Sequence, residues 1–191
     1  MNLVSNSCVG AFIQVKEFKE KLNNPFTWAL IDCDSMYNLI SKWNELNFEN
    51  YELKRYDNWK FSIIIENLVE IKYIHYKFDK NAKSPIKKDI DIYYNKIWEY
   101  IVEKYETRLK RMKELNEEPI FILGNGWTTK ETTLSIDFIK KLNTLKKNNI
   151  IVVVDKIIPE FTNIKQIENV KKDTYGANPK LAKKIYDKFL K

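Results

Sequence analysis

The sequence predicts an α/β fold with a mixed, partly parallel central sheet, helices on both faces of the sheet and an antiparallel hairpin insertion. Short uninterrupted apolar runs alternate with segments of helical period, which is typical of parallel strands covered on both faces. Residues 51–76 instead contain β-rich stretches separated by turn-forming residues, which indicates antiparallel pairing. The chain has 191 residues and no low-complexity linker, so we expect one domain over residues 1–191.

The first third of the chain is expected to alternate strands and helices. The expected elements are a strand over residues 2–5, a helix over 10–22, an apolar run over 26–31 and a helix over 36–46. Asp34 and Ser35 are expected to cap the last helix, because their side-chain oxygens can accept hydrogen bonds from its first backbone N–H groups.

The rest of the chain continues this alternation after the antiparallel segment. Within that segment, β-rich stretches lie around Leu53, over 61–65 and over 69–76, with turns at Asn58-Trp59 and Glu66-Asn67. The elements expected beyond it are a long helix over 89–115, a strand over 120–123, a helix over 129–147, a strand over 150–154 and a helix over 178–190.

The composition argues against several classes of protein. Lys and Arg number 33 against 26 Asp and Glu, a net charge of +7, but the lysines are spread over helices and no nucleic-acid-binding motif is present. No apolar run approaches the ~20 residues that span a bilayer, and the N-terminal stretch, interrupted by Ser5, Asn6 and Ser7, would make a poor secretion signal. We therefore expect a cytoplasmic protein that does not bind nucleic acid, and its charge is compatible with peripheral contact at the inner membrane.

Metal and cofactor sites are not expected either. Two cysteines and one histidine make neither a disulfide framework nor a zinc site of ordinary spacing. We expect the protein to need no metal and no cofactor.

Cys8 and His75 are the candidate catalytic pair. Each stands where a short apolar run gives way to polar or Gly-containing sequence, the position where α/β proteins usually carry their chemistry. A helix N-terminus lowers the pKa of a cysteine thiol. The amides that follow Cys8 can stabilise an oxyanion, and Gly10 allows the backbone to approach closely. His75 would serve as the base.

Each of these residues also has an ordinary structural interpretation. Cys8 can be a small buried hydrophobe, and His75 can be a hydrogen-bonded residue at a strand end. Cys33 lies between Asp32 and Asp34, whose charges are expected to raise its pKa, so we predict that it is not catalytic.

Two arginines stand out in the long helix. Wound at about 100° per residue, Arg108 projects inside the apolar stripe, and Arg111 lies at its edge. A guanidinium there needs an anion or several carbonyl groups. Arg108 is therefore a candidate anchor for a phosphate or carboxylate, with a snorkelling or structurally paired arginine as the alternative.

Three polar residues are candidates to orient the histidine. Asn125 lies in a Gly-Asn-Gly turn after a buried strand and could orient His75 or donate to an oxyanion, although such a sequence is also an ordinary turn. Asp79 lies four residues beyond His75, and Asp155 ends the last buried strand.

Four short motifs, taken in order, resemble the uncharacterised bacterial proteins called exopolysaccharide biosynthesis proteins. They are Ser5-Asn6-Ser7-Cys8-Val9-Gly10, Asn24-Pro25-Phe26-Thr27-Trp28, Ile74-His75-Tyr76-Lys77 and Arg108-Leu109-Lys110-Arg111. The chain is more distantly similar to papain-like cysteine peptidases, but it departs from their pattern at Thr27 and Tyr76, where that group has or often has Asp. The resemblance implies Cys8 as nucleophile and His75 as base, with Asn6, Arg108 and Arg111 as further family positions.

These observations predict a cysteine-dependent acyl transferase or hydrolase acting on a sugar or sugar conjugate in bacterial surface polysaccharide biosynthesis. The expected partner is a sugar or sugar-phosphate substrate. Supporting or substrate-binding residues are expected to be Asn6, Gly10, Asp79, Arg108, Arg111 and Asn125. One alternative is a glycan-modifying transferase that uses a phosphorylated or nucleotide-sugar donor without a covalent cysteine intermediate. Another is a non-catalytic partner of the polysaccharide assembly machinery.

Overall fold

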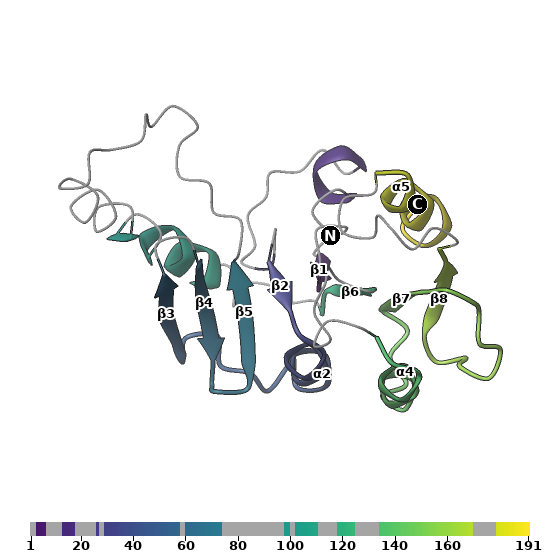
Figure 1. Ribbon diagram of the computed structural model, residues 1–191, viewed down its shortest axis with the longest axis horizontal. Coiled ribbons are helices and arrows are strands. Elements are labelled where there is room, and N and C mark those ends of the chain that lie inside the picture. The colour runs from purple at the N-terminus through teal and green to yellow at the C-terminus, as the bar shows by residue number, and fades with distance from the viewer. Residues whose placement is uncertain are drawn as a thin grey trace.

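In the part of the chain that the structure describes, two four-stranded sheets form the framework, one parallel and one antiparallel (Figure 1). The computed structural model describes residues 3–6, 13–17, 26, 29–57, 60–73, 98–99, 102–110, 118–124, 134–169 and 179–191. The predicted mixed α/β class is confirmed.

The parallel sheet has the strand order β1-β6-β7-β8. Its strands are β1 (Leu3–Ser5), β6 (Ile120–Leu123), β7 (Ile150–Val154) and β8 (Lys165–Glu168). The predicted strands over 2–5, 120–123 and 150–154 are confirmed within a residue. β8 was not predicted, because an edge strand of four residues with one buried apolar side chain, Ile167, gives almost no hydrophobic pattern.

Helices cover both faces of this sheet, as predicted. In Figure 1, α5 (Pro179–Phe189) and the short π-helical turn η1 (Ile13–Glu17) lie on one side, and α2 (Cys33–Ser41) and α4 (Ile136–Asn143) lie on the other. Side chains of β7 alternate between the two faces. Ile151 and Val153 belong to the core under α5, whereas Val152 belongs to the core under α2 and α4.

The antiparallel sheet has the order β2-β5-β4-β3, so the expected hairpin insertion is part of a larger sheet. Its strands are β2 (Leu30–Ile31), β3 (Tyr51–Asp57), β4 (Lys60–Ile65) and β5 (Val69–Tyr73). The predicted turn at Glu66-Asn67 is confirmed. Both residues have positive φ, 52° and 57°, as mirror-image hairpin turns require, and Leu68 N–H donates to Ile65 C=O at 2.9 Å.

One hydrophobic core joins the two sheets. It contains Phe121 of β6 and Ile63 of β4 in the same cluster of buried side chains. Trp43 follows α2 and packs edge-on against Phe121, with ring centres 5.7 Å apart. The aromatic rings here provide large buried areas and specific edge-to-face geometry.

The helical residues 102–110 pack on the core-facing side of the antiparallel sheet. Tyr105 lies edge-on to Phe61 of β4, with ring centres 5.3 Å apart. Burial, followed by a hydrogen bond with Glu106 and the charge of that carboxylate, raises the pKa of Tyr51 to about 12. These contacts hold the helix against β3 and β4, which supports the predicted long helix over the part that the structure describes.

A half-buried lysine connects three parts of the fold. Lys147 donates from Nζ to the backbone C=O of Ile40 in α2 at 2.8 Å, and it forms an ion pair with Glu118, which precedes β6. Lys147 itself lies just before β7, so its ammonium group ties α2 to the amino ends of two parallel strands.

The ends of two predicted helices were wrong. The cap of α2 is Asp32, whose Oδ1 accepts from Ser35 N–H at 2.7 Å, and not Asp34 or Ser35. α2 ends at Ser41 rather than near 46, because residues 42–45 form separate turns and the apolar side chains that follow enter the core.

α4 begins at Ile136, later in the chain than the expected start at residue 129. Ser135 is extended, and its Oγ accepts from Phe138 N–H at 3.1 Å, so the helix cannot begin before it. Hydrophobic periodicity does not locate helix ends, and here the cap residues set them. The expected turn at Asn58-Trp59 lies outside the described residues, as do large parts of the helices expected over 10–22 and 89–115.

Two residues of the described chain that have positive φ offer a test of the backbone conformation. Glu66 and Lys146 have φ of 52° and 53°, a conformation that disfavours residues with a Cβ atom. Glu66→Gly and Lys146→Gly are each expected to raise the free energy of unfolding by about 0.5–1 kcal/mol. Urea denaturation measures the change. Glu160→Gly, at an exposed turn position, is the control and should give no increase; an equal gain there would contradict the assignment.

Candidate functional site

The structure describes two of the eight predicted site residues, Asn6 and Arg108. The other six lie outside the described residues: Cys8, Gly10, His75, Asp79, Arg111 and Asn125. Asn6 and Gly124 are the described residues that precede Cys8 and Asn125 in the chain.

Asn6 lies at the carboxyl edge of the parallel sheet, directly after β1, and is only 1% exposed. Its side-chain amide binds both backbone groups of Gly124, the residue after β6. Asn6 Nδ2 donates to Gly124 C=O at 2.8 Å, and Gly124 N–H donates to Asn6 Oδ1 at 3.1 Å. We call this arrangement the Asn6–Gly124 clamp.

The clamp extends the pairing of β1 and β6 beyond the last paired residues of the strands. Asn6 N–H also donates to Ile122 C=O at 3.3 Å. A carboxamide supplies one acceptor and two donors, so a single side chain satisfies both the N–H and the C=O of the buried Gly124. An apolar side chain at this position would leave both backbone groups without a partner, which is costly in a buried site.

Two predicted site residues continue directly from the clamp along the chain. Cys8 follows Asn6 by two residues, and Asn125 is the residue after Gly124. The carboxyl ends of parallel strands are the usual location of binding and catalytic groups in open α/β sheets. The clamp therefore fixes the starting points of both predicted loops relative to each other.

Other polar groups occur at the same edge. Asp155 follows β7 and is exposed, and Asn169 follows β8 and donates from its N–H to Val154 C=O at 2.9 Å. Within the described ranges, no cluster of three or more His, Cys, Asp or Glu side chains is placed to hold a metal ion.

Cys33 is a half-buried thiol at the start of α2. Burial is the main cause that raises its pKa to about 11, and the charges of Asp32 and Asp34 add to this effect. The predicted direction of the shift is confirmed. The thiolate form of Cys33 is therefore scarce near neutral pH, although the residue stands at a helix N-terminus.

Arg108 is half-buried on the helical residues 102–110. Its guanidinium carbon lies 5.0 Å from the centre of the Tyr105 ring, which is the range of a cation–π contact. Lys104 lies one turn earlier, and its pKa is lowered by burial first and by the charge of Arg108 second. Two positive groups thus lie close together on this helix, which favours an anion as their neighbour.

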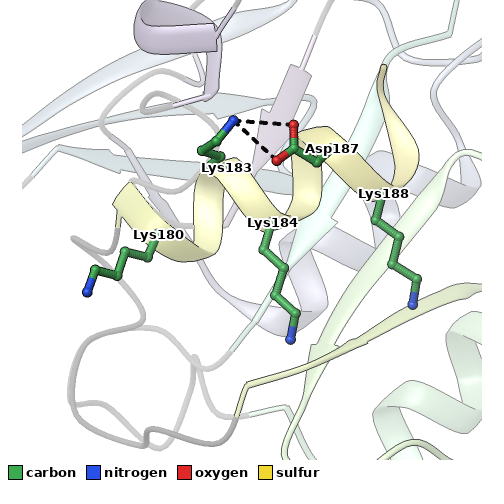
Figure 2. Close-up of a pocket in the computed structure, with 5 residues that line it drawn as sticks. All are labelled: Lys180, Lys183, Lys184, Asp187 and Lys188. Carbon is green, nitrogen blue, oxygen red and sulfur yellow. Dashed lines mark hydrogen bonds and ion pairs between the residues drawn. The ribbon is translucent and has the colours of Figure 1, made fainter.

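The structure also contains a basic surface that the sequence analysis did not recognise. Lys180, Lys183, Lys184, Asp187 and Lys188 line an open hollow of about 500 Å³ on α5 (Figure 2). The sequence signal was the spacing of Lys180, Lys184 and Lys188 at every fourth residue, which places them on one side of a helix. In the composition this pattern was hidden, because lysines are frequent throughout the chain.

Comparisons with protein-family models, with curated proteins and with solved structures find no match for this chain. The resemblance to exopolysaccharide biosynthesis proteins therefore depends on the four short motifs alone.

The clamp predicts a stability effect that is large for one polar residue. Asn6→Ala should lower the free energy of unfolding by about 2–4 kcal/mol, because it leaves the buried N–H and C=O of Gly124 without partners. Chemical denaturation followed by circular dichroism measures the change. Asn149→Ala is the control, because Asn149 donates a single bond, to Pro119 C=O at 2.8 Å. A smaller loss at Asn6 than at Asn149 would contradict the assigned bonds.

The environment of Cys33 predicts slow alkylation. In a Cys8→Ala variant, where Cys33 is the remaining cysteine, the iodoacetamide rate should reach half its maximum near pH 11. Asp34→Asn should move that midpoint downward, because it removes one of the negative charges that disfavour the thiolate. Mass spectrometry of quenched samples gives the rates, and a midpoint at or below the ordinary thiol range would show that burial of Cys33 is wrongly assigned.

Proposed function

We propose that this protein is a cysteine-dependent acyl transferase or hydrolase that acts on a sugar conjugate, with Cys8 as nucleophile and His75 as base. The observation that carries the proposal is the Asn6–Gly124 clamp, which holds the ends of β1 and β6 together immediately before Cys8 and Asn125. A covalent mechanism needs its groups held to within about 0.5 Å, and a buried two-bond clamp is suited to that task.

The chemistry assigned to these residues is acyl transfer through a thioester. Cys8 gives its proton to His75 and attacks the acyl carbonyl as a thiolate, forming a C–S bond and a tetrahedral oxyanion. The intermediate collapses, and the leaving group departs with the proton held by His75. A sugar hydroxyl or a water molecule then attacks the thioester, gives its proton to His75 and releases Cys8. Backbone amides beside Cys8 would stabilise the oxyanion at both stages.

The contrast between the two cysteines supports the choice of nucleophile. Cys33 has a pKa of about 11, so it would supply very little thiolate at neutral pH. Cys8 is then the cysteine that is left for nucleophilic chemistry. Cytosolic reductants keep thiols reduced, which suits a mechanism that needs Cys8 as a free thiol, so we propose a cytoplasmic location. In the described part of the chain, no helix has the length and apolar character needed to cross a bilayer.

The position of β5 supports the choice of base. β5 ends at Tyr73, two residues before His75. It pairs with β2, and Ile31 of β2 belongs to the same buried core as Phe121 of the parallel sheet.

The positive charge of Lys104 and Arg108 supports an anionic group on the substrate. Burial first, and the charge of Arg108 second, lower the pKa of Lys104, and a phosphate or carboxylate of a sugar conjugate would offset the second of these causes. The resemblance to exopolysaccharide biosynthesis proteins supports a sugar as the remaining part of that substrate. We therefore propose Arg108 as an anion-binding residue that orients the conjugate.

The test is the pH dependence of Cys8 alkylation in a Cys33→Ser background. Half of the maximal rate is expected below pH 7, and His75→Ala should raise that midpoint, because it removes the group that accepts the thiol proton. Asn6→Ala should also raise it, whereas Asn149→Ala should not. A midpoint near 8.5, the ordinary value for a thiol, unchanged by His75→Ala, would rule out the proposed pair.

A chemical probe provides a second test of the covalent step. With p-nitrophenyl acetate, the protein should give a burst of p-nitrophenol equal to the amount of enzyme, and Cys8→Ala should abolish it while Cys33→Ser retains it. A mass increase of one acetyl group on Cys8 would identify the intermediate. Retention of full turnover in Cys8→Ala would favour the alternative transferase that forms no covalent intermediate.

A further inference from the structure

The outer side of α5 carries a regular row of lysines. Lys180, Lys184 and Lys188 follow one another at every fourth residue, and Figure 2 shows their side chains extending to the same side of the helix. An α-helix rises about 1.5 Å per residue, so successive lysines are about 6 Å apart along its axis. We call these three residues the lysine row.

Backbone carbonyls, and not carboxylates, are the partners found for two members of the row. Lys184 Nζ donates to Glu168 C=O at 2.8 Å, and Lys188 Nζ donates to Gln166 C=O at 3.2 Å. Both carbonyls belong to β8, the last strand of the parallel sheet. A carbonyl group orients an ammonium group without cancelling its charge, and each of these bonds uses one of three N–H donors.

Lys183, the fourth lysine that lines the hollow, has a carboxylate as its partner. Lys183 lies 3.2 Å from Asp187 Oδ2, and the hydrogen bond with Asp187 raises its pKa. All five side chains line the same hollow, and Asp187 is the acid among them. Asp187 pairs with Lys183, so four lysines and one aspartate leave the hollow with a net positive charge.

The helix that carries the row is fixed to the body of the protein. Leu181 and Ile185 are buried against the parallel sheet, in the same cluster as Ile151 and Val153 of β7. α5 therefore cannot turn its apolar side toward a membrane without unfolding this core. Any ligand of the row has to be bound by charge at the outer surface.

We propose that the lysine row docks the protein on a bilayer surface that contains anionic phospholipid headgroups. The hollow is open and is lined by residues of α5 alone, so it offers no enclosing wall for a small ligand. An extended anionic surface can contact all three ammonium groups at once, and its negative potential attracts lysines near the surface. This inference is independent of the thiol chemistry, because it uses none of the residues proposed for it.

The full-length protein and phospholipid vesicles test the proposal. Co-sedimentation compares vesicles of phosphatidylcholine alone with vesicles containing roughly 30% phosphatidylglycerol, at roughly 0.05 M and 0.5 M NaCl. Binding is expected to the anionic vesicles at low salt, and it should be lost at high salt because surface charges are screened. Cys8→Ala should bind as the unmodified protein does, which separates this result from a failure of the proposed function.

The decisive comparison is between two variants of equal net charge. The first carries Lys180→Gln, Lys184→Gln and Lys188→Gln, and should bind roughly 100-fold more weakly, at about fivefold per lysine. The control neutralises three exposed lysines on other elements and should bind within about threefold of the unmodified protein. These are Lys110→Gln, Lys140→Gln and Lys156→Gln.

Several outcomes would overturn the proposal. Equal weakening in both variants would show that the net charge of +7, and not the row, attracts the vesicles. A rise in Tm with inorganic pyrophosphate that disappears in the row variant, without vesicle binding, would identify a soluble phosphate ligand instead. Thermal denaturation of both variants confirms that each is folded.

Discussion

The architecture of the proposed site depends on the satisfaction of one buried peptide group. Gly124 directly follows β6, where the regular ladder between β1 and β6 has stopped, and is itself buried. The side chain of Asn6 supplies both missing partners. Because water does not compensate buried backbone groups, the ends of the two strands are held at one relative position. Cys8 and Asn125 both follow that position closely along the chain.

The fold class could be predicted because the core strands carry continuous apolar runs. Ile120–Leu123 and Ile150–Val154 have no polar interruption, and central strands of a parallel sheet are the usual place for such runs. The strand β8 could not be predicted in the same way. Its position at the sheet edge requires little burial, and three of its four residues are polar. The predicted ends of two helices were wrong, because a capping residue, Asp32 or Ser135, determines where each helix begins and apolar periodicity does not.

Sequence analysis could predict a feature of the candidate site only where residues adjacent in the chain cause that feature. The raised pKa of Cys33 followed in direction from the two acids beside it, although burial, which depends on the fold, proved to be the larger cause. The partner of Asn6 lies 118 residues away, so no local pattern could connect the two. The spacing of the α5 lysines at every fourth residue can be read from the sequence. Their hydrogen bonds to the carbonyls of β8 cannot, because these bonds depend on how α5 packs against the sheet.

Hydrogen bonds to the carbonyls of β8 explain the positions of two lysines of the row, but they do not explain why these positions carry a positive charge. An open strand edge invites pairing with another chain, and lysines beside it are a common protection. Lys184 and Lys188 serve this purpose through Glu168 C=O and Gln166 C=O. Neutral donors such as glutamine amides could form the same bonds without mutual repulsion between ammonium groups. Lys180 lies about one turn before Lys184 and about two turns before Lys188, at the start of the row. The hollow is lined by four lysines and one aspartate, and this net positive charge is the reason to assign the row to an anionic surface.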